Sequence, residues 1–184
     1  MDVKDAIEQR RAYRALDPVE ISDDTVRELA SAAQLAPSCF NNQPWRFVFV
    51  RDSAQLAKMR GVMSKGNEWA FKASMIIAVF SKKEDDCVIK DREYHQFDTG
   101  MAVGLLILRA TELGLVAHPI AGFSPKKARE VLGIPDIYQV ITLINVGKKG
   151  QGLSGLSEGQ REAERPERKP FGEFAYIDRF PVQQ

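Results

Sequence analysis

The chain has 184 residues, of which 44% are hydrophobic, with 26 lysines and arginines against 25 aspartates and glutamates. A chain of this length buries about 70% of the surface that it exposes when unfolded, so it can form a core without disulfides or metals. The near-neutral charge excludes the basic excess that nucleic-acid binding needs, and no apolar stretch approaches the roughly 20 residues that span a bilayer. The first residues also lack the features of a secretory signal, so we expect a cytoplasmic protein that binds neither nucleic acid nor membrane.

Two helices and a loop are predicted in the first 44 residues. Apolar residues at helical spacing indicate a short helix that ends near the basic cluster Arg10–Arg14. A second helix is expected to begin after Ser22, a suitable N-cap, and to stop at Pro37. The segment 37–44 is dense in turn-forming and amide side chains, which predicts an ordered loop.

Continuous apolar runs predict the central strands of a sheet. The runs 74–81 and 140–146 have strand length, and continuous hydrophobicity is typical of strands that are covered on both faces. An alternating run over 45–51 predicts another strand, which a short helix over 54–63 follows.

A long helix is predicted between the two central strands. Apolar residues surround the segment 94–113 almost completely, so we expect it to be buried against several partners. A strand is expected over 115–120. Ser124 and Pro125 are suitable first residues of another helix, which ends near Gly133.

The composition changes after residue 149, so we expect a domain over 1–149 followed by a C-terminal arm over 150–184. Glycines and a charged run over 161–169 can bury little of a core. The arm is expected to lie over the body of the protein or over a second subunit, because it carries the aromatic residues Phe171, Phe174, Tyr176 and Phe180.

The cysteines and histidines do not indicate a metal centre. Cys39 and Cys87 are far apart and match no metal-ligand spacing and no disulfide framework. His95 and His118 are too few and too scattered for a site built from His and Cys. The common nucleophile and phosphate-loop motifs are missing from the sequence, so hydrolysis by a catalytic triad is not expected.

Two groups of residues have both a chemical and a structural interpretation. Arg10, Arg11 and Arg14 offer forked donors that match phosphate oxygens, or they solvate a helix end and pair with nearby acids. The amides of residues 41–43 can contact a heterocycle, or they only build turns.

Several short motifs occur in an order that resembles the FMN-dependent nitroreductase family. Of the two motifs nearest the N-terminus, RRxxR and APSCFNNQPW, the second is the more specific. The resemblance covers nearly the whole chain. The matching motifs are RRxxR at 10–14, APSCFNNQPW at 36–45, Asn67 before an apolar strand, LGL at 113–115, PIAGF at 119–123, LGIP at 132–135, NVG at 145–147 and Arg168-x-Pro170.

The resemblance implies an α+β fold with a mixed central β-sheet flanked by helices. It also implies an intertwined homodimer with FMN at the interface. The FMN contacts that it implies, position by position, are Arg10, Arg11, Arg14, Pro37, Ser38, Cys39, Asn41, Asn67, Pro119, Ile120, Ala121, Gly122 and Arg168.

Each part of this implied site has its own role. The N-terminal arginines bind the phosphate together with Arg168, for which Arg165 is a competing candidate. Asn67 contacts the isoalloxazine edge or the ribityl chain, and residues 37–41 come from the other subunit. Residues 119–122 line one face of the ring, with a backbone N–H of Ala121 or Gly122 near N5.

Three positions depart from the family pattern. Many members have serine where Ala12 stands and an acidic residue where Ala121 stands, so contacts of those side chains are lost here. Members often carry serine at the Cys39 position. The thiol there is either oxidisable or an inert, small buried side chain, and the second interpretation is preferred because no cationic partner is evident nearby.

The resemblance implies an enzyme in which NADH or NADPH and then an electron-poor acceptor use the same flavin face in a ping-pong cycle. Flavin N5 carries the chemistry, so no catalytic side chain is assigned, and Lys148, Lys149 or an N-terminal arginine would stabilise the reduced flavin. The acceptor is a small molecule such as a nitroaromatic, a quinone or a flavin. One alternative is specialised flavin chemistry, such as dehalogenation or flavin breakdown, for which Gly61–Lys72 is the only obvious short lid candidate. The other alternative is a flavin-binding module without turnover.

Overall fold

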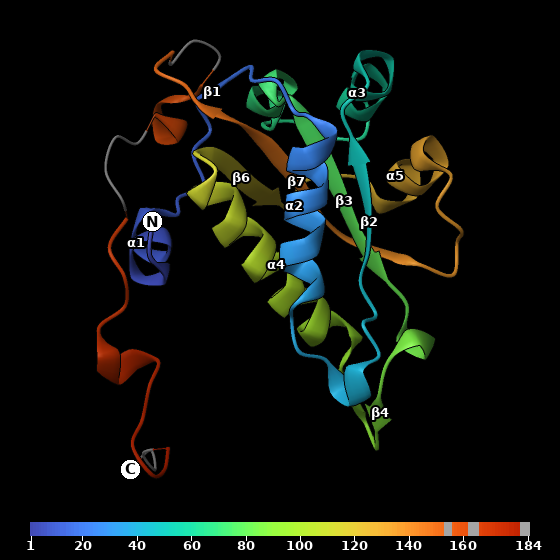
Figure 1. Ribbon diagram of the computed structural model, residues 1–184, viewed down its shortest axis with the longest axis vertical. Coiled ribbons are helices and arrows are strands. Elements are labelled where there is room, and N and C mark those ends of the chain that lie inside the picture. Colours follow the sequence, from blue (N-terminus) through green and yellow to red (C-terminus); the bar gives the residue numbers. More distant parts are fainter. Residues whose placement is uncertain (153–155, 162–165, 181–184) are drawn as a thin grey trace.

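The computed structural model describes residues 1–152, 156–161 and 166–180, and a β-sheet with helices on both faces forms its centre (Figure 1). The strands of this sheet are β1 (Leu16–Asp17), β2 (Arg46–Val50), β3 (Met75–Ser81), β6 (Leu115–Ile120) and β7 (Gln139–Lys149). A small hairpin consists of β4 (Val88–Ile89) and β5 (Arg92–Glu93). The α-helices are α1 (Val3–Gln9), α2 (Asp23–Gln34), α3 (Ser53–Arg60), α4 (His95–Glu112) and α5 (Pro125–Leu132).

Strand β7 organises the sheet. It pairs with β3 and with β6, while β3 also pairs with β2 and the C-terminal end of β7 pairs with β1. The predicted central position of the two apolar strands and the α+β fold with a helix-flanked sheet are confirmed. These pairings are all antiparallel, so the parallel pair of a mixed sheet is not formed within the described part of the chain.

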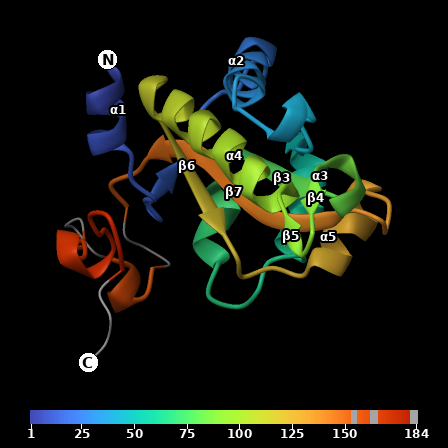
Figure 2. The same cartoon turned by 90° about the horizontal axis from the view of Figure 1, so that it is seen from below.

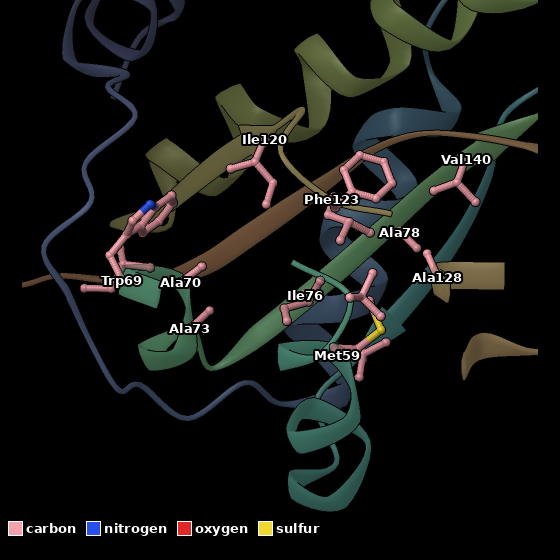
Figure 3. Close-up of a cluster of buried hydrophobic side chains, with 14 of the residues drawn as sticks. Met59, Trp69, Ala70, Ala73, Ile76, Ala78, Ile120, Phe123, Ala128 and Val140 are labelled. Atoms are coloured by element: carbon pink, nitrogen blue, oxygen red, sulfur yellow. The ribbon is translucent and has the colours of Figure 1, made fainter. Parts of the chain in front are cut away.

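Two hydrophobic cores form because side chains alternate between the faces of the fully buried strand β3. Ile76 and Ala78 pack on the face that α3 and α5 cover, and Figure 3 shows part of this cluster. Met75 and Ile77 pack on the opposite face with residues of α2 and α4 (Figure 2). The sheet therefore separates the α2–α4 layer from the α3–α5 layer.

The helix ends follow the local signals in the sequence. The side chain of Ser22 accepts a hydrogen bond from the backbone N–H of Thr25 and caps α2. Ser124 caps α5 in the same way, and Gly133 ends that helix with a left-handed φ of 66°. These predicted boundaries are confirmed.

Helix α4 differs from its prediction because one of its sides is open in this chain. Ala102 and Leu106 are fully buried against the sheet, whereas Phe97 is 64% exposed and Leu105 is 36% exposed. Apolar residues around a helix predict burial on all sides, but this chain supplies partners for only part of that surface. Among the described residues, no helix is both long and apolar enough to cross a bilayer.

The described part of the C-terminal arm exposes large apolar side chains. Beyond residue 166 these residues are Phe171, Phe174, Tyr176, Ile177 and Phe180. In both views this segment runs along the outside of the molecule on the side of α1 (Figures 1 and 2). The division into a domain over 1–149 and an arm over 150–184 stays a prediction.

Candidate functional site

Asn67 and Gly122 are in direct contact just beyond the end of β6. The Nδ2 atom of Asn67 donates a hydrogen bond to the carbonyl oxygen of Gly122 at 3.0 Å, and Nε1 of Trp69 donates to Oδ1 of Asn67 at 3.3 Å. A Cβ atom at position 122 would lie only 2.4 Å from Nδ2 of Asn67. Glycine at this position therefore allows the close approach of the asparagine amide.

Backbone pairing holds the segment before Asn67 against the segment after β6. The N–H of Ser64 donates to the carbonyl oxygen of Gly122 at 2.9 Å, and the N–H of Ser124 donates to that of Val62 at 2.8 Å. Trp69 and Ala70, within the 3₁₀ helix Glu68–Lys72, are buried beside β6 (Figure 3). Val62, Trp69 and Ala70 thus anchor the segment 61–72 to the body of the protein, while the residues between them, 64–66, are exposed.

His118 connects the N-terminal arginine segment 10–14 to Trp69. Its Nδ1 atom is hydrogen-bonded to the carbonyl oxygen of Tyr13 at 3.0 Å, and its ring lies 4.4 Å from that of Trp69, centroid to centroid. Arg14 and Trp69 also line one small crevice. Contacts therefore run without a break from the segment 10–14 through His118 and Trp69 to Asn67 and Gly122.

Several cationic side chains gather around Tyr13. The guanidinium carbon of Arg11 lies 5.0 Å from the centroid of the Tyr13 ring, and Nζ of Lys149 lies 4.6 Å from it. Lys148 and Lys149 are exposed at the end of β7, where they pair with β1. An anion bound beside this segment would meet a positive potential.

Burial lowers the pKa of His118 below its ordinary value of 6.5. The bond to the Tyr13 carbonyl acts in the opposite direction, whereas Arg14 and Arg10 lower the pKa further through charge repulsion. The same two arginines that repel an imidazolium ion would attract a phosphate.

The lowered pKa of His118 predicts a loss of stability in acid. The unfolded state binds a proton near the ordinary pKa of 6.5 and the folded state does not, so stability is full above that pH and falls as the pH decreases. Below about pH 6 we expect the free energy of unfolding to fall by up to about 1.4 kcal/mol per pH unit from this residue.

Urea denaturation of the wild type and of His118→Asn, from about pH 5 to about pH 7.5, measures this slope. The variant lacks the titrating imidazole and should lose that part of the slope. A slope that is equal in both proteins would contradict the assignment.

The loop 37–44 lies elsewhere, beside the N-terminus of α4 and the β4–β5 hairpin (Figure 1). The N–H of Cys39 donates to Oδ2 of Asp98 at 2.7 Å, and Nδ2 of Asn42 donates to Oδ1 of Asp86 at 3.3 Å. Pro37 instead borders an open apolar hollow of about 490 Å³ over α4, as does Arg10. Within the described residues this loop makes no hydrogen bond to Asn67 or Gly122.

Cys39 and Cys87 form a disulfide, with Cα atoms 6.0 Å apart and a separation of 48 positions in the sequence. The expectation that they match no disulfide framework is therefore wrong, and Cys39 is not a thiol in this structure. The fold brings them together because loop 37–44 follows α2, while Cys87 precedes the α4 helix against which α2 packs.

Two buried carboxyl groups lie beside this disulfide. Burial raises the pKa of Asp98 above its ordinary value, with the nearby Asp86 adding to the increase, while the hydrogen bond from the Cys39 N–H opposes it. Oδ2 of Asp86 is buried without a hydrogen-bond partner among the described residues.

Some described residues of the tail pack beside the site, and others are exposed to solvent. Leu156 is buried in the core around Trp69, and Nε2 of Gln160 donates to the carbonyl oxygen of Gly66 at 2.8 Å. Arg168 is exposed, and its NH1 donates to the carbonyl oxygen of Pro166. Arg165, the competing phosphate ligand, lies outside the described residues.

The structure thus brings together only part of the predicted contacts. Arg11, Arg14, Asn67 and the segment 119–122 lie around Tyr13 and β6, whereas Ser38, Cys39 and Asn41 belong to the loop beside the N-terminus of α4. Arg10 and Pro37 border the same hollow over α4, and Arg168 lies in the arm. Sequence reasoning missed Trp69 and His118, which connect the residues around Tyr13 and β6, and no local pattern marks either residue as part of a site.

Comparison with known proteins places these observations in a family. A model of the family described as the nitroreductase family matches residues 7–68 and 62–148. A protein of Archaeoglobus fulgidus, provisionally named as an NADH dehydrogenase/NAD(P)H nitroreductase, is 30% identical over 145 residues, which cover 75% of this chain and 80% of that protein. A Thermus thermophilus protein named NADH dehydrogenase is 26% identical over 178 residues, covering 80% of this chain and 86% of that one.

A solved structure shares the fold over the full length. It is described as an oxidoreductase containing FMN, and it is 30% identical with a TM-score of 0.85. The match covers 100% of this chain and 95% of that chain.

Proposed function

Because the chain belongs to the nitroreductase family, we propose that it is an FMN-dependent oxidoreductase that transfers electrons from NADH or NADPH to electron-poor small molecules. The observation that carries this proposal is the continuous set of contacts from the arginine segment 10–14 through His118 and Trp69 to Asn67 and Gly122. Cationic side chains that would suit a phosphate lie at one end of this set, and at the other end an amide and exposed backbone would suit a flat ring.

The donors at the end of β6 fit an isoalloxazine ring. Ala121 is exposed, and within the described residues neither Ala121 nor Gly122 donates its N–H to a backbone carbonyl outside the regular elements. An N–H that is left open in a loop can donate to a ring nitrogen of a ligand. When bound, FMN would supply hydride acceptance and donation, so the protein needs no catalytic acid or base.

The residues of this chain would hold and orient the cofactor. Arg10, Arg11 and Arg14 would bind the phosphate, where forked donors satisfy several oxygens at once. The amide of Asn67, fixed by Trp69 and Gly122, would position the ring or the ribityl chain. Lys148 and Lys149, near the same segment, would add to the positive potential around the phosphate.

A second copy of the chain would complete the site. Loop residues 38–41 make no hydrogen bond to Asn67 or Gly122 within the described part of the chain, which suits the proposed role of the loop in FMN contacts across a dimer interface, and Pro37 borders the same hollow over α4 as Arg10. The open side of α4 offers that interface, because its apolar hollow is lined by Met101, Gly104, Leu105, Ile107 and Leu108. The exposed aromatic residues of the arm and Arg168 would also contact the partner subunit.

The alternatives require other features. Specialised flavin chemistry, such as dehalogenation, would use a lid, but the candidate segment 61–72 is fastened by backbone hydrogen bonds to the segment after β6 and by the buried side chains of Val62 and Trp69. A binding module without turnover would hold the same cofactor, and only a kinetic measurement separates it from an enzyme.

The visible absorption spectrum of the protein tests the proposal directly. We expect the purified protein, or the protein after addition of FMN, to show a bound flavin band that NADPH or NADH bleaches without oxygen. An acceptor such as a quinone should then restore the band. A flavin band that neither nucleotide bleaches would favour the binding module, and a failure to bind FMN would refute the proposal.

Replacing Gly122 by alanine should disturb the site through Asn67. The new Cβ would lie 2.4 Å from Nδ2 of Asn67, so this amide must move and lose its hydrogen bonds to Gly122 and Trp69. We expect the free energy of unfolding to fall by about 1–3 kcal/mol, and FMN affinity to fall with it.

The control is Gly172→Ala, because an added Cβ there would meet nothing within 4 Å. In an Asn67→Ala background Gly122→Ala should cost little, since the next contact is Cβ of Ser64 at 3.7 Å. Equal costs in both backgrounds, measured by urea denaturation, would show that Asn67 is not the cause.

A further inference from the structure

The Cys39–Cys87 disulfide joins two segments of the α4 end of the molecule (Figure 1). Cys39 begins the 3₁₀ helix Cys39–Asn41 in the loop 37–44, and Cys87 lies directly before β4. Both cysteines are half-buried rather than enclosed in a core. The bond therefore fastens the loop that is proposed to contact FMN to the β4–β5 hairpin.

The fastened loop has a strained backbone. Phe40, Asn41 and Gln43 have φ angles of 47°, 59° and 50°, in the left-handed region that non-glycine residues seldom adopt. Asparagine tolerates this region, but a phenylalanine there is unusual, and its side chain is 89% exposed. Such conformations persist only where the surrounding structure holds them.

Few other contacts hold the middle of the loop. The N–H of Cys39 donates to Asp98, and Nδ2 of Asn42 donates to Asp86 at 3.3 Å. Gln43 bonds to Ser38 and Asn41 within the loop itself, and its carbonyl oxygen accepts a hydrogen bond from the exposed Arg46 of β2 at 3.0 Å. The disulfide is thus the strongest connection between the strained loop and the hairpin.

We propose that the Cys39–Cys87 bond is a reversible dithiol–disulfide site, a substrate for a dithiol reductant, whose reduction releases the loop 37–44 and weakens FMN binding. The proposal rests on the proposed function for its second part, because the loop is assigned there to the FMN of the partner subunit. A cytoplasmic location, which the sequence predicts, suits a reversible bond, since disulfides in that compartment are mostly transient or regulatory.

The chemistry is an ordinary exchange. A thiolate of the reductant attacks one sulfur, the S–S bond breaks, and the displaced cysteine sulfur leaves as a thiolate that takes up a proton. The second thiol of the reductant then attacks the mixed disulfide and releases the other cysteine. In sum, two electrons and two protons pass from the dithiol to Cys39 and Cys87, and the reductant becomes a disulfide.

The experiment compares air-oxidised protein with protein reduced by dithiothreitol and then freed of it. Thiols are counted after denaturation, FMN affinity is measured by quenching of flavin fluorescence, and amide hydrogen exchange is followed in the loop. Buffers contain EDTA, because donor atoms of Cys39, Asp86 and Cys87 lie within 4.8 Å of one another and a metal ion could bridge the released thiolates.

Two variants separate the bond from other effects of the reductant. Cys87→Ser removes the bond and leaves the sequence of the loop unchanged. The double variant Cys39→Ser/Cys87→Ser cannot form the bond under either condition, so it should respond to neither oxidation nor reduction.

We expect no thiols in the oxidised wild type and two after reduction. Loop amides should exchange faster in the reduced protein, and FMN should bind about 10-fold more weakly because the loop is no longer preorganised. Cys87→Ser should match the reduced wild type under both conditions.

Free thiols in the air-oxidised protein, or exchange and FMN affinity that are equal in both forms, would overturn the proposal. If neither form binds FMN, the proposed function is wrong, and hydrogen exchange still decides whether reduction releases the loop.

Discussion

The double variant Arg10→Gln/Arg14→Gln is expected to bind FMN roughly 100-fold to 10,000-fold more weakly than the wild type. Each charge-assisted hydrogen bond to the phosphate should contribute about 1.5–3 kcal/mol, and glutamine removes the charge without reversing it. Titration of the apoprotein with FMN, followed by flavin fluorescence, measures this loss.

Riboflavin provides a sharp control, since it carries the same ring without the phosphate. Its affinity should be the same for the wild type and the double variant, whereas that of FMN should not. The matched variant Lys126→Gln removes a cation whose side chain is 81% exposed on α5, and it should change neither affinity. Equal weakening of FMN and riboflavin would show that the arginines support the fold rather than the phosphate.

The same double variant also reports on the location of the arginines without any ligand. Because Arg14 and Arg10 lower the pKa of His118 by charge repulsion, their removal should raise that pKa. Titration of the His118 ring by NMR measures the change. An unchanged pKa would mean that the arginine side chains lie away from His118 in solution.

Replacing Leu105 by glutamate should convert the protein to monomers that bind FMN poorly. Leu105 lines the apolar hollow on α4, and a symmetric interface through this face would bury two unpaired carboxylates. A penalty of several kcal/mol predicts a dimer dissociation constant raised by about 1000-fold or more. FMN affinity should fall too, since the loop 37–44 of the partner would no longer reach the site.

Sedimentation velocity gives the oligomeric state, and circular dichroism shows whether the monomers are folded. Ile137→Glu is the matched control, because Ile137 is an apolar residue that is 66% exposed away from this face, between α5 and β7. It should leave the dimer intact. A wild type that sediments as a monomer, or a Leu105→Glu protein that stays dimeric, would contradict the proposed interface.

Local signals in the sequence predict the five α-helices and the strands β2, β3, β6 and β7, but not the two-residue strands β1, β4 and β5. Ser22, Ser124 and Gly133 act within one turn of their own helices, so the pattern around each residue predicts where a helix begins or ends. The apolar runs of β3 and β7 likewise predict central strands, because burial on both faces leaves no polar alternation.

Contacts between distant segments could not be predicted in this way. The disulfide joins positions 48 residues apart, and its formation depends on how the loop after α2 meets the hairpin before α4. The roles of Trp69 and His118 depend on the packing of a 3₁₀ helix against β6, which no spacing in the sequence encodes. Motif resemblance named Asn67 and Gly122, but the structure supplied the 3.0 Å bond that connects them.

The position of β7 also bears on how the chain folds as it is synthesised. This strand pairs with β1, β3 and β6, yet it ends at Lys149, after all of its partners. Until β7 has left the ribosome, the fully buried strand β3 has an unpaired edge and no completed sheet beneath its two helix layers. The nascent protein therefore carries an aggregation-prone strand from the synthesis of Ser81 to that of Lys149, and folding of the sheet is delayed until its last strand emerges.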